Sequence, residues 1–243
     1  MEVNWTASGL SDAHCLNFDF MVLQTFRKCV EKMSYLPFST RLASYLTARS
    51  GVSPEKEVIL TYIIEVLIIN LLNVIFTLML GWVLGVFHVT LACLLAVILF
   101  RHTAGGAHSQ SPIRCAFITI LVFPIMGLSA TFISTINATF INGLSVIGII
   151  TILLSVIILA PVDSSAAPII SDSRRAKLKA LSLLIVCLVS LVLVNLSISS
   201  WEGAREIQSG LALSMLWTSF ILSKLGHRFI SLIDRLNVPK VRR

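Results

Sequence analysis

The chain has 243 residues, of which 56% are hydrophobic and only 13% are charged, and its mean hydropathy is +0.90. A soluble domain of average composition carries roughly 25% charged residues, so this composition excludes an ordinary soluble protein. The net charge of +7 fits cationic loops at a membrane surface, and we expect no nucleic-acid partner. The sequence therefore predicts one polytopic membrane domain whose surface contacts lipid.

The N-terminal part of the chain differs from the rest. Residues 1–20 contain Asp12, His14 and Asp19 without an apolar core, so they do not resemble a signal peptide. We interpret residues 1–36 as an N-terminal extension and consider Met33 as an alternative start. Residues 37–56 form a predicted interfacial amphipathic helix, because apolar residues recur there at about helical spacing. The alternative is a solvated helix that packs on the membrane domain.

Residues 57–243 form the predicted transmembrane domain, and the fold class that we expect is all-α. A helix needs about 20 apolar residues to cross a bilayer core, and the segments lack the alternation of a β-barrel. The first two segments form a hairpin around Gly81 and Gly85, and the third and fourth join through Asn137 and Asn142. The six predicted spans are 58–80, 83–100, 115–136, 140–160, 180–199 and 207–223.

The cationic residues predict the orientation of these spans. All of the 19 Lys and Arg residues except Arg205 lie in the N-terminal segment, in alternate loops or in the tail from Lys224. Because cytoplasmic loops are enriched in Lys and Arg, we expect both termini and the loop at 101–115 to face the cytoplasm.

A polar break between the second and third spans reads RHTAGGAHSQSPIRC over residues 101–115. Its Cys115 is a candidate nucleophile. Ser111 and Pro112 predict the start of a helix, which would place Cys115 near a positive helix terminus that favours a thiolate. The alternative is a structural cysteine, as we expect for Cys93 within an apolar run.

The same break supplies a candidate base and a candidate oxyanion site. His108 lies seven residues before Cys115, which on one continuous helix would mean about 10.5 Å of rise. The segment between them must therefore fold back for the two side chains to meet. Gly105 and Gly106 can aim N–H groups at an oxyanion, although two glycines are also typical of a simple turn.

Two charged residues in or beside the spans are candidate supporting groups. Arg101 ends the second span, where it could reach the interface, order the loop or hold a substrate carboxylate. Glu65 lies within the first span and could orient His108 or pair with Arg101. A competing interpretation is a zinc site of His102, His108 and Cys115, but this spacing fits no common zinc pattern, and we expect no metal or other cofactor.

These residues resemble the accessory gene regulator B (AgrB) family of bacterial membrane cysteine peptidases over about residues 35–225. The match lies in an arginine that ends a span, a Gly-Gly pair, a histidine and a later cysteine. Further similarities are Tyr62, Glu65 and the stretch APVDSSAAPIISDSRRAKLK at 160–179. The matching motif residues are Arg101, Gly105, Gly106, His108 and Cys115.

The resemblance implies a membrane endopeptidase that removes the C-terminal tail of a small quorum-sensing propeptide, with Cys115 as nucleophile and His108 as base. It implies a thioester acyl-enzyme, closure of a peptide ring, an acidic-tailed partner of the AgrD type and a homodimer. A predicted basic loop would bind the acidic tail or serve only as an orientation signal. Its residues are Arg174, Arg175, Lys177 and Lys179.

Two other classes of protein fit the same composition. A small transporter or permease for a peptide or lipid would use Glu65 and other polar groups inside the membrane, and would not depend on Cys115. A regulatory membrane subunit would carry out no chemistry at all. A gene nearby that encodes a short amphipathic peptide with an acidic tail would favour the peptidase.

Overall fold

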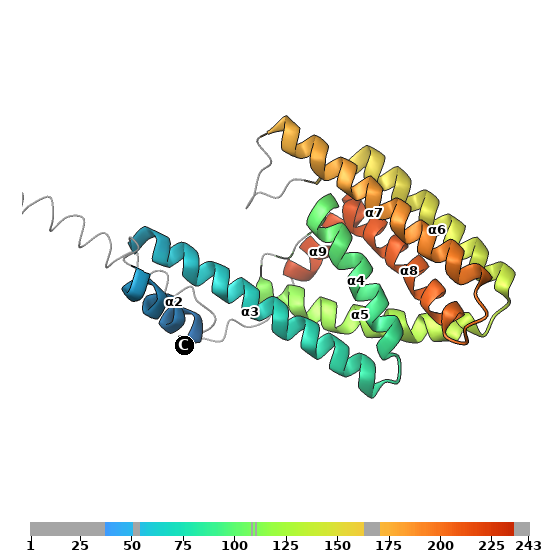
Figure 1. The fold of residues 1–243 in the computed structure, drawn as a ribbon, viewed down its shortest axis with the longest axis horizontal. Coiled ribbons are helices and arrows are strands. Elements are labelled where there is room, and N and C mark those ends of the chain that lie inside the picture. The colour runs from blue at the N-terminus through green and yellow to red at the C-terminus, as the bar shows by residue number, and fades with distance from the viewer. Residues whose placement is uncertain (1–36, 51–53, 108, 110, 163–170, 236–243) are drawn as a thin grey trace, which may run out of the picture. The chain divides into compact units, whose positions relative to one another are not determined.

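A computed structural model describes residues 37–50, 54–107, 109, 111–162 and 171–235, and the N-terminal extension at 1–36 lies outside them. Within the described residues the regular structure is entirely helical (Figure 1). This confirms the predicted fold class of an all-α integral membrane protein. The chain divides into two units, residues 1–70 and 71–243, and helix α3 runs through the boundary between them.

The first unit contains α2 (Pro37–Ser50) and the first part of α3 (Pro54–Val83). Helix α2 buries Ser39 and Ala43 and exposes Phe38, Tyr45 and Leu46. The apolar face that the sequence predicts is therefore the exposed face of this helix. Exposed apolar residues on one side of a short helix suit a membrane interface, and the interfacial position stays a prediction.

The described residues of the second unit form the rest of α3 and six further helices. Helices α3 to α7 are each long and apolar enough to cross a membrane. The sixth predicted span, 207–223, forms α8, which is not among the five helices that are long and apolar enough to cross a membrane. Helix α8 packs against α4, α5, α6 and α7 (Figure 1). The six helices are α4 (Phe87–Ala104), α5 (Pro112–Ser134), α6 (Ala138–Leu159), α7 (Asp172–Ile198), α8 (Ala204–Leu222) and α9 (Lys224–Arg235).

Helix α8 is less apolar than α4, α5 and α6. It packs against four candidate spans and can satisfy its polar groups there. The Gln208 side chain donates from Nε2 to Asn142 Oδ1 at 2.9 Å and to Ser145 Oγ at 3.1 Å, both on α6. The hydroxyls of Ser214 and Thr218 donate to carbonyls one turn earlier on α8 itself. Ser and Thr can lie inside a bundle at little cost when they bond in this way.

The turns largely follow the prediction. Gly85 has a φ of +74° in the hairpin between α3 and α4, and Asn137 caps α6 by accepting a hydrogen bond from the Phe140 N–H at 2.8 Å. The predicted place of Asn142 in the turn between the third and fourth spans is wrong. It lies within α6, where its amide provides the partner that buried Gln208 requires.

Close packing of α8 on α4 depends on Gly210. A Cβ atom at this position would lie 2.6 Å from Val89 Cγ1 and 2.9 Å from Cys93 Sγ, both on α4. Small residues let membrane helices approach closely, and their contact energy comes from this fit. The two helices therefore meet at a distance that only glycine allows at this point.

We predict that Gly210→Ala destabilises the second unit by about 1–3 kcal/mol, because the added methyl overpacks the contact with α4. The thermal midpoint of the purified protein in detergent, followed by tryptophan fluorescence, measures this loss. Gly143→Ala on α6 is the matched control, because a Cβ atom there meets nothing within 4 Å. Equal midpoints for the two variants would contradict the close contact.

The cationic loops lead to a prediction about orientation. In a cysteine-free background, Ser200→Cys in the exposed turn after α7 should react with a membrane-impermeant maleimide added to intact cells. Ser231→Cys, exposed on α9, should react only after the membrane is permeabilised. Labelling of position 231 from outside would reverse the predicted topology.

Candidate functional site

The loop from α4 to α5 begins with two glycines that the local geometry requires. Gly105 has a φ of +78°, and a Cβ atom there would lie 2.6 Å from the Val162 carbonyl oxygen. Gly106 has a φ of +132°, and its Cβ atom would lie 2.9 Å from Ile221 Cγ2. Both values lie in the region that favours glycine, so steric fit and backbone conformation each demand glycine at both positions.

Backbone hydrogen bonds fix this part of the loop against two other helix ends. The Val162 N–H donates to the Ala104 carbonyl at 2.9 Å, and the Ala107 N–H donates to the Ile221 carbonyl at 3.1 Å. Ala107 is buried and packs with Ile221 and Ile230. The Ala107 N–H is therefore occupied, and the N–H groups of Gly105 and Gly106 stay the predicted candidates for an oxyanion site.

Cys115 is the fourth residue of α5. The helix starts as the sequence predicts, with Ser111 in extended conformation and Pro112 at the first helical position. The hydroxyl of Ser111 does not cap the helix, but its carbonyl accepts the Cys115 N–H at 3.1 Å. The half-buried Cys115 side chain thus lies in the first turn, where the helix dipole favours negative charge.

Arg101 reaches from the last turn of α4 to the sulfur of Cys115. Its Nη2 atom donates to Cys115 Sγ at 3.3 Å. Snorkelling toward the interface alone does not account for this contact. A guanidinium group that donates to sulfur can stabilise a thiolate, since hydrogen bonds between charged partners are stronger than neutral ones.

His108 lies outside the described residues, so its pairing with Cys115 stays a prediction. The structure does describe both of its neighbours in the chain. Ala107 is bound to α8, and the Ser109 hydroxyl donates to Asp234 Oδ1 on α9 at 2.5 Å. The loop on each side of His108 is therefore attached to a different helix.

Helix α9 is a part of the site that the sequence analysis missed. We interpreted the chain after Lys224 as a cationic tail, whereas residues Lys224–Arg235 form a helix that packs on α8. Apolar residues at 225, 229, 232 and 233 recur at helical spacing and could have indicated it. Arg114 donates from Nη1 to the Asp234 carbonyl at 2.5 Å and pairs with its carboxylate at 3.6 Å.

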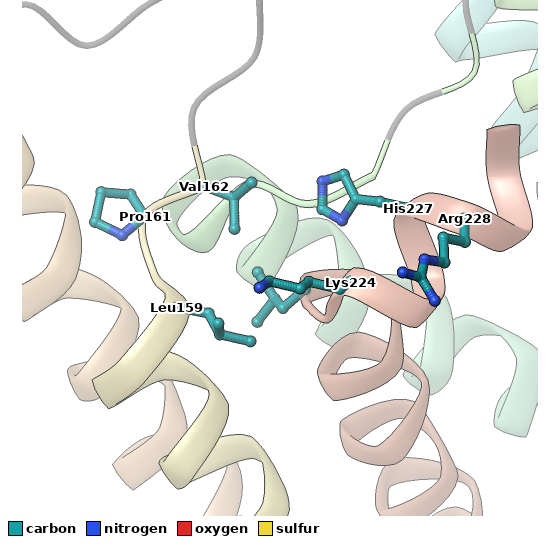
Figure 2. Close-up of a pocket in the computed structure, with 7 residues that line it drawn as sticks. Leu159, Pro161, Val162, Lys224, His227 and Arg228 are labelled. Carbon is teal, nitrogen blue, oxygen red and sulfur yellow. The ribbon is translucent and has the colours of Figure 1, made fainter.

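A pocket of about 510 Å³ lies beside the glycine pair, between the C-terminal end of α6 and the start of α9 (Figure 2). Val162, whose carbonyl faces Gly105, lines it together with three basic side chains of α9. The cations Lys224 and Arg228, beside apolar side chains, suit a ligand in which an anionic group lies next to an apolar one. The lining residues are Leu159, Pro161, Val162, Leu222, Lys224, His227 and Arg228.

The four cations that we predicted in a basic loop lie on a helix instead. Helix α7 begins at Asp172, eight residues before the predicted span, so the four cations lie on its first turns. Helical spacing places Arg174 and Lys177 on one face and Arg175 and Lys179 on another. Lys179 donates from Nζ to the Ile157 carbonyl of α6 at 2.7 Å. Solvated cations are good helix formers, so the helix extends beyond its apolar part.

The remaining candidates are Glu65 and the alternative zinc site. Glu65 is 8% exposed and lies on α3 in the first unit, and its pairing with Arg101 or His108 stays a prediction. The described residues contain no group of three His, Cys, Asp or Glu side chains that could hold a metal ion. The alternative zinc set includes His108, which lies outside those residues.

Comparison with known proteins identifies the family. A family model described as Accessory gene regulator B matches residues 39–222. Putative AgrB-like protein 2 of Clostridium perfringens (strain 13 / Type A) is 25% identical over 203 residues, which cover 81% of this chain and 94% of that protein. Accessory gene regulator protein B of Staphylococcus aureus (strain bovine RF122 / ET3-1) is 31% identical over 155 residues, which cover 63% of this chain and 80% of that protein. No solved structure matches. The chain therefore belongs to the accessory gene regulator B family.

Proposed function

We propose that the protein is a membrane-embedded cysteine endopeptidase that removes the C-terminal tail of a small quorum-sensing propeptide and closes the remaining peptide into a ring. The observation that carries this proposal is the hydrogen bond from Arg101 to Cys115 Sγ at the start of α5. A thiol beside a guanidinium group and a helix N-terminus has the environment of a nucleophile rather than of a structural cysteine.

The first half of the reaction forms an acyl-enzyme. His108 accepts the thiol proton, and the Cys115 sulfur attacks the carbonyl carbon of the scissile peptide bond. N–H groups of Gly105 and Gly106 stabilise the negative oxygen of the tetrahedral intermediate. The C–N bond then breaks, His108 returns the proton to the leaving amine, and the tail departs from a thioester on Cys115.

The second half closes the ring. A thiol or hydroxyl within the bound peptide attacks the thioester carbonyl, and the Cys115 sulfur leaves and recovers its proton. Exchange between thioesters is nearly isoenergetic, whereas formation of a thioester from an amide is uphill. Removal of the tail or of the ring therefore drives the net reaction. A site that excludes water favours capture by the peptide over hydrolysis.

The membrane position fits a propeptide that lies on the cytoplasmic face. The glycine pair, Cys115 and α9 lie at the helix ends that the positive charges assign to that face. The partner that we propose is an AgrD-like propeptide with an acidic tail, bound at the cations on α7. A transporter would have no need of Cys115, so substitution of this residue separates the two functions.

We predict that Cys115→Ala abolishes cleavage of a co-expressed propeptide, because no other group supplies the acyl-enzyme sulfur. His108→Ala should prevent formation of the acyl-enzyme, since a neutral thiol is a poor nucleophile. Mass spectrometry of the peptide products measures both effects. Cys187→Ala is the control, because that free cysteine is exposed on α7 away from the polar loop. Normal processing by Cys115→Ala would exclude cysteine chemistry.

The two faces of α7 give a paired test of substrate binding. We predict that Arg174→Gln with Lys177→Gln raises KM severalfold and flattens its dependence on salt, with kcat nearly unchanged, because exposed charges attract an acidic tail over about one Debye length of 8 Å.

Arg175→Gln with Lys179→Gln removes the same charge from the face on which Lys179 bonds to α6. This pair should raise KM less. Both variants must first show the wild-type labelling pattern at positions 200 and 231, because cations also set topology. Equal KM values in the two pairs and the wild type would leave these residues as orientation signals.

A further inference from the structure

Asp234 of α9 reaches the segment that precedes Cys115 at two points. Its Oδ1 atom accepts the Ser109 hydroxyl at 2.5 Å and lies 3.6 Å from Arg114 Nη1, which also donates to the Asp234 carbonyl. The Asp234 and Arg114 side chains are only 12% and 28% exposed. Partial burial reduces solvent screening, so this pair should be stronger than an exposed ion pair.

These contacts act at the two ends of a short stretch of backbone. The Ser109 hydroxyl, which donates to Asp234, also accepts a hydrogen bond from the Ser111 N–H at 3.2 Å, directly before α5. Arg114 is the residue before Cys115. Asp234 therefore contacts both Ser109 and the first turn of the helix that carries the proposed nucleophile.

The attachment of α9 to the bundle does not depend on this carboxylate. Ile230 is 5% exposed and packs with Ala107 and Ile221, and the Phe229 ring lies 5.7 Å from the Phe220 ring. At Gly226 a Cβ atom would lie 2.2 Å from the Phe220 carbonyl oxygen, so α9 meets the end of α8 in close contact. Loss of the Asp234 charge should thus leave the helix in place.

We propose that Asp234 is a positioning residue, which holds Ser109 and Arg114 so that Cys115, the residue after Arg114, keeps its productive geometry. This inference rests on the proposed peptidase function. Asp234 acts through Ser109 and Arg114 and does not itself touch the substrate. Misplacement of a catalytic group by about 1 Å can cost on the order of 100-fold in rate, so a lost tether should appear mainly in kcat.

The test compares Asp234→Asn, Asp234→Glu and Ser109→Ala in the full-length protein in lipid nanodiscs, with a synthetic propeptide as substrate. We expect Asp234→Asn to lower kcat about 10- to 100-fold with KM within about twofold of wild type. Asp234→Glu keeps the charge and should recover part of the rate. Asp172→Asn, which removes an exposed carboxylate from the first turn of α7, is the control and should keep the wild-type kcat.

A double-mutant cycle tests whether Ser109 and Asp234 act together. The cycle uses Asp234→Ala, because an asparagine side chain would still offer an Oδ1 acceptor to the Ser109 hydroxyl. The combined variant should be no slower than Asp234→Ala alone, because both substitutions break the same contact. The thermal midpoint of each variant should stay near that of the wild type, since Ile230 and Gly226 hold α9 on the bundle.

The outcomes separate this inference from the proposed function. If Cys115→Ala still cleaves the propeptide, the peptidase function itself is wrong. If Cys115→Ala is inactive and Asp234→Asn has wild-type kcat, the positioning role alone is wrong. A rise in KM without a change in kcat would also overturn it, because that result would assign Asp234 to substrate binding.

Discussion

Hydrocarbon offers no hydrogen-bond partners, and this constraint governs where the polar groups of the second unit lie. Gln208 bonds to side chains of α6, and the hydroxyls of α8 bond to their own helix, while apolar side chains cover the outer faces of α5, α6 and α7. Gln208 therefore helps to hold α8 against α6, whereas the Ser214 and Thr218 hydroxyls of α8 need no partner helix. A reactive group that must meet a polar peptide belongs at a helix end, where α4 stops and α5 starts.

The candidate site uses that helix end in three ways. The last turn of α4 presents Arg101, the glycine pair lets the chain pass between Val162 and Ile221, and Pro112 starts a new helix that carries Cys115. Each feature depends on the one before it. The turn must be tight for the guanidinium group to reach a sulfur that lies fourteen residues further along the chain.

The sequence predicts features that depend on neighbouring residues and misses those that depend on distant ones. Length and hydropathy predict the five membrane-spanning candidates α3 to α7, and Ser111 and Pro112 predict the start of α5, because these signals are local. The contact of Arg101 with Cys115 requires the packing of two helices, which no spacing rule provides. The early start of α7 was missed because its first turns are cationic rather than apolar, and α9 was missed because its cations looked like a tail. Asp234 carries no local sign that its partners are Ser109 and Arg114, more than a hundred residues earlier.

The order in which the helices are translated determines when the contact between α9 and the loop can form. Helices α4 and α5 leave the ribosome well before α9, so Ser109 and Arg114 enter the membrane surface without the carboxylate that later binds them. Gly226 and Ile230 dock α9 only once α8 is in place among the other helices. The contacts of Ser109 and Arg114 are thus completed by the last described helix. Under the proposed function, the surroundings of the Cys115 sulfur are complete only when translation of α9 has finished.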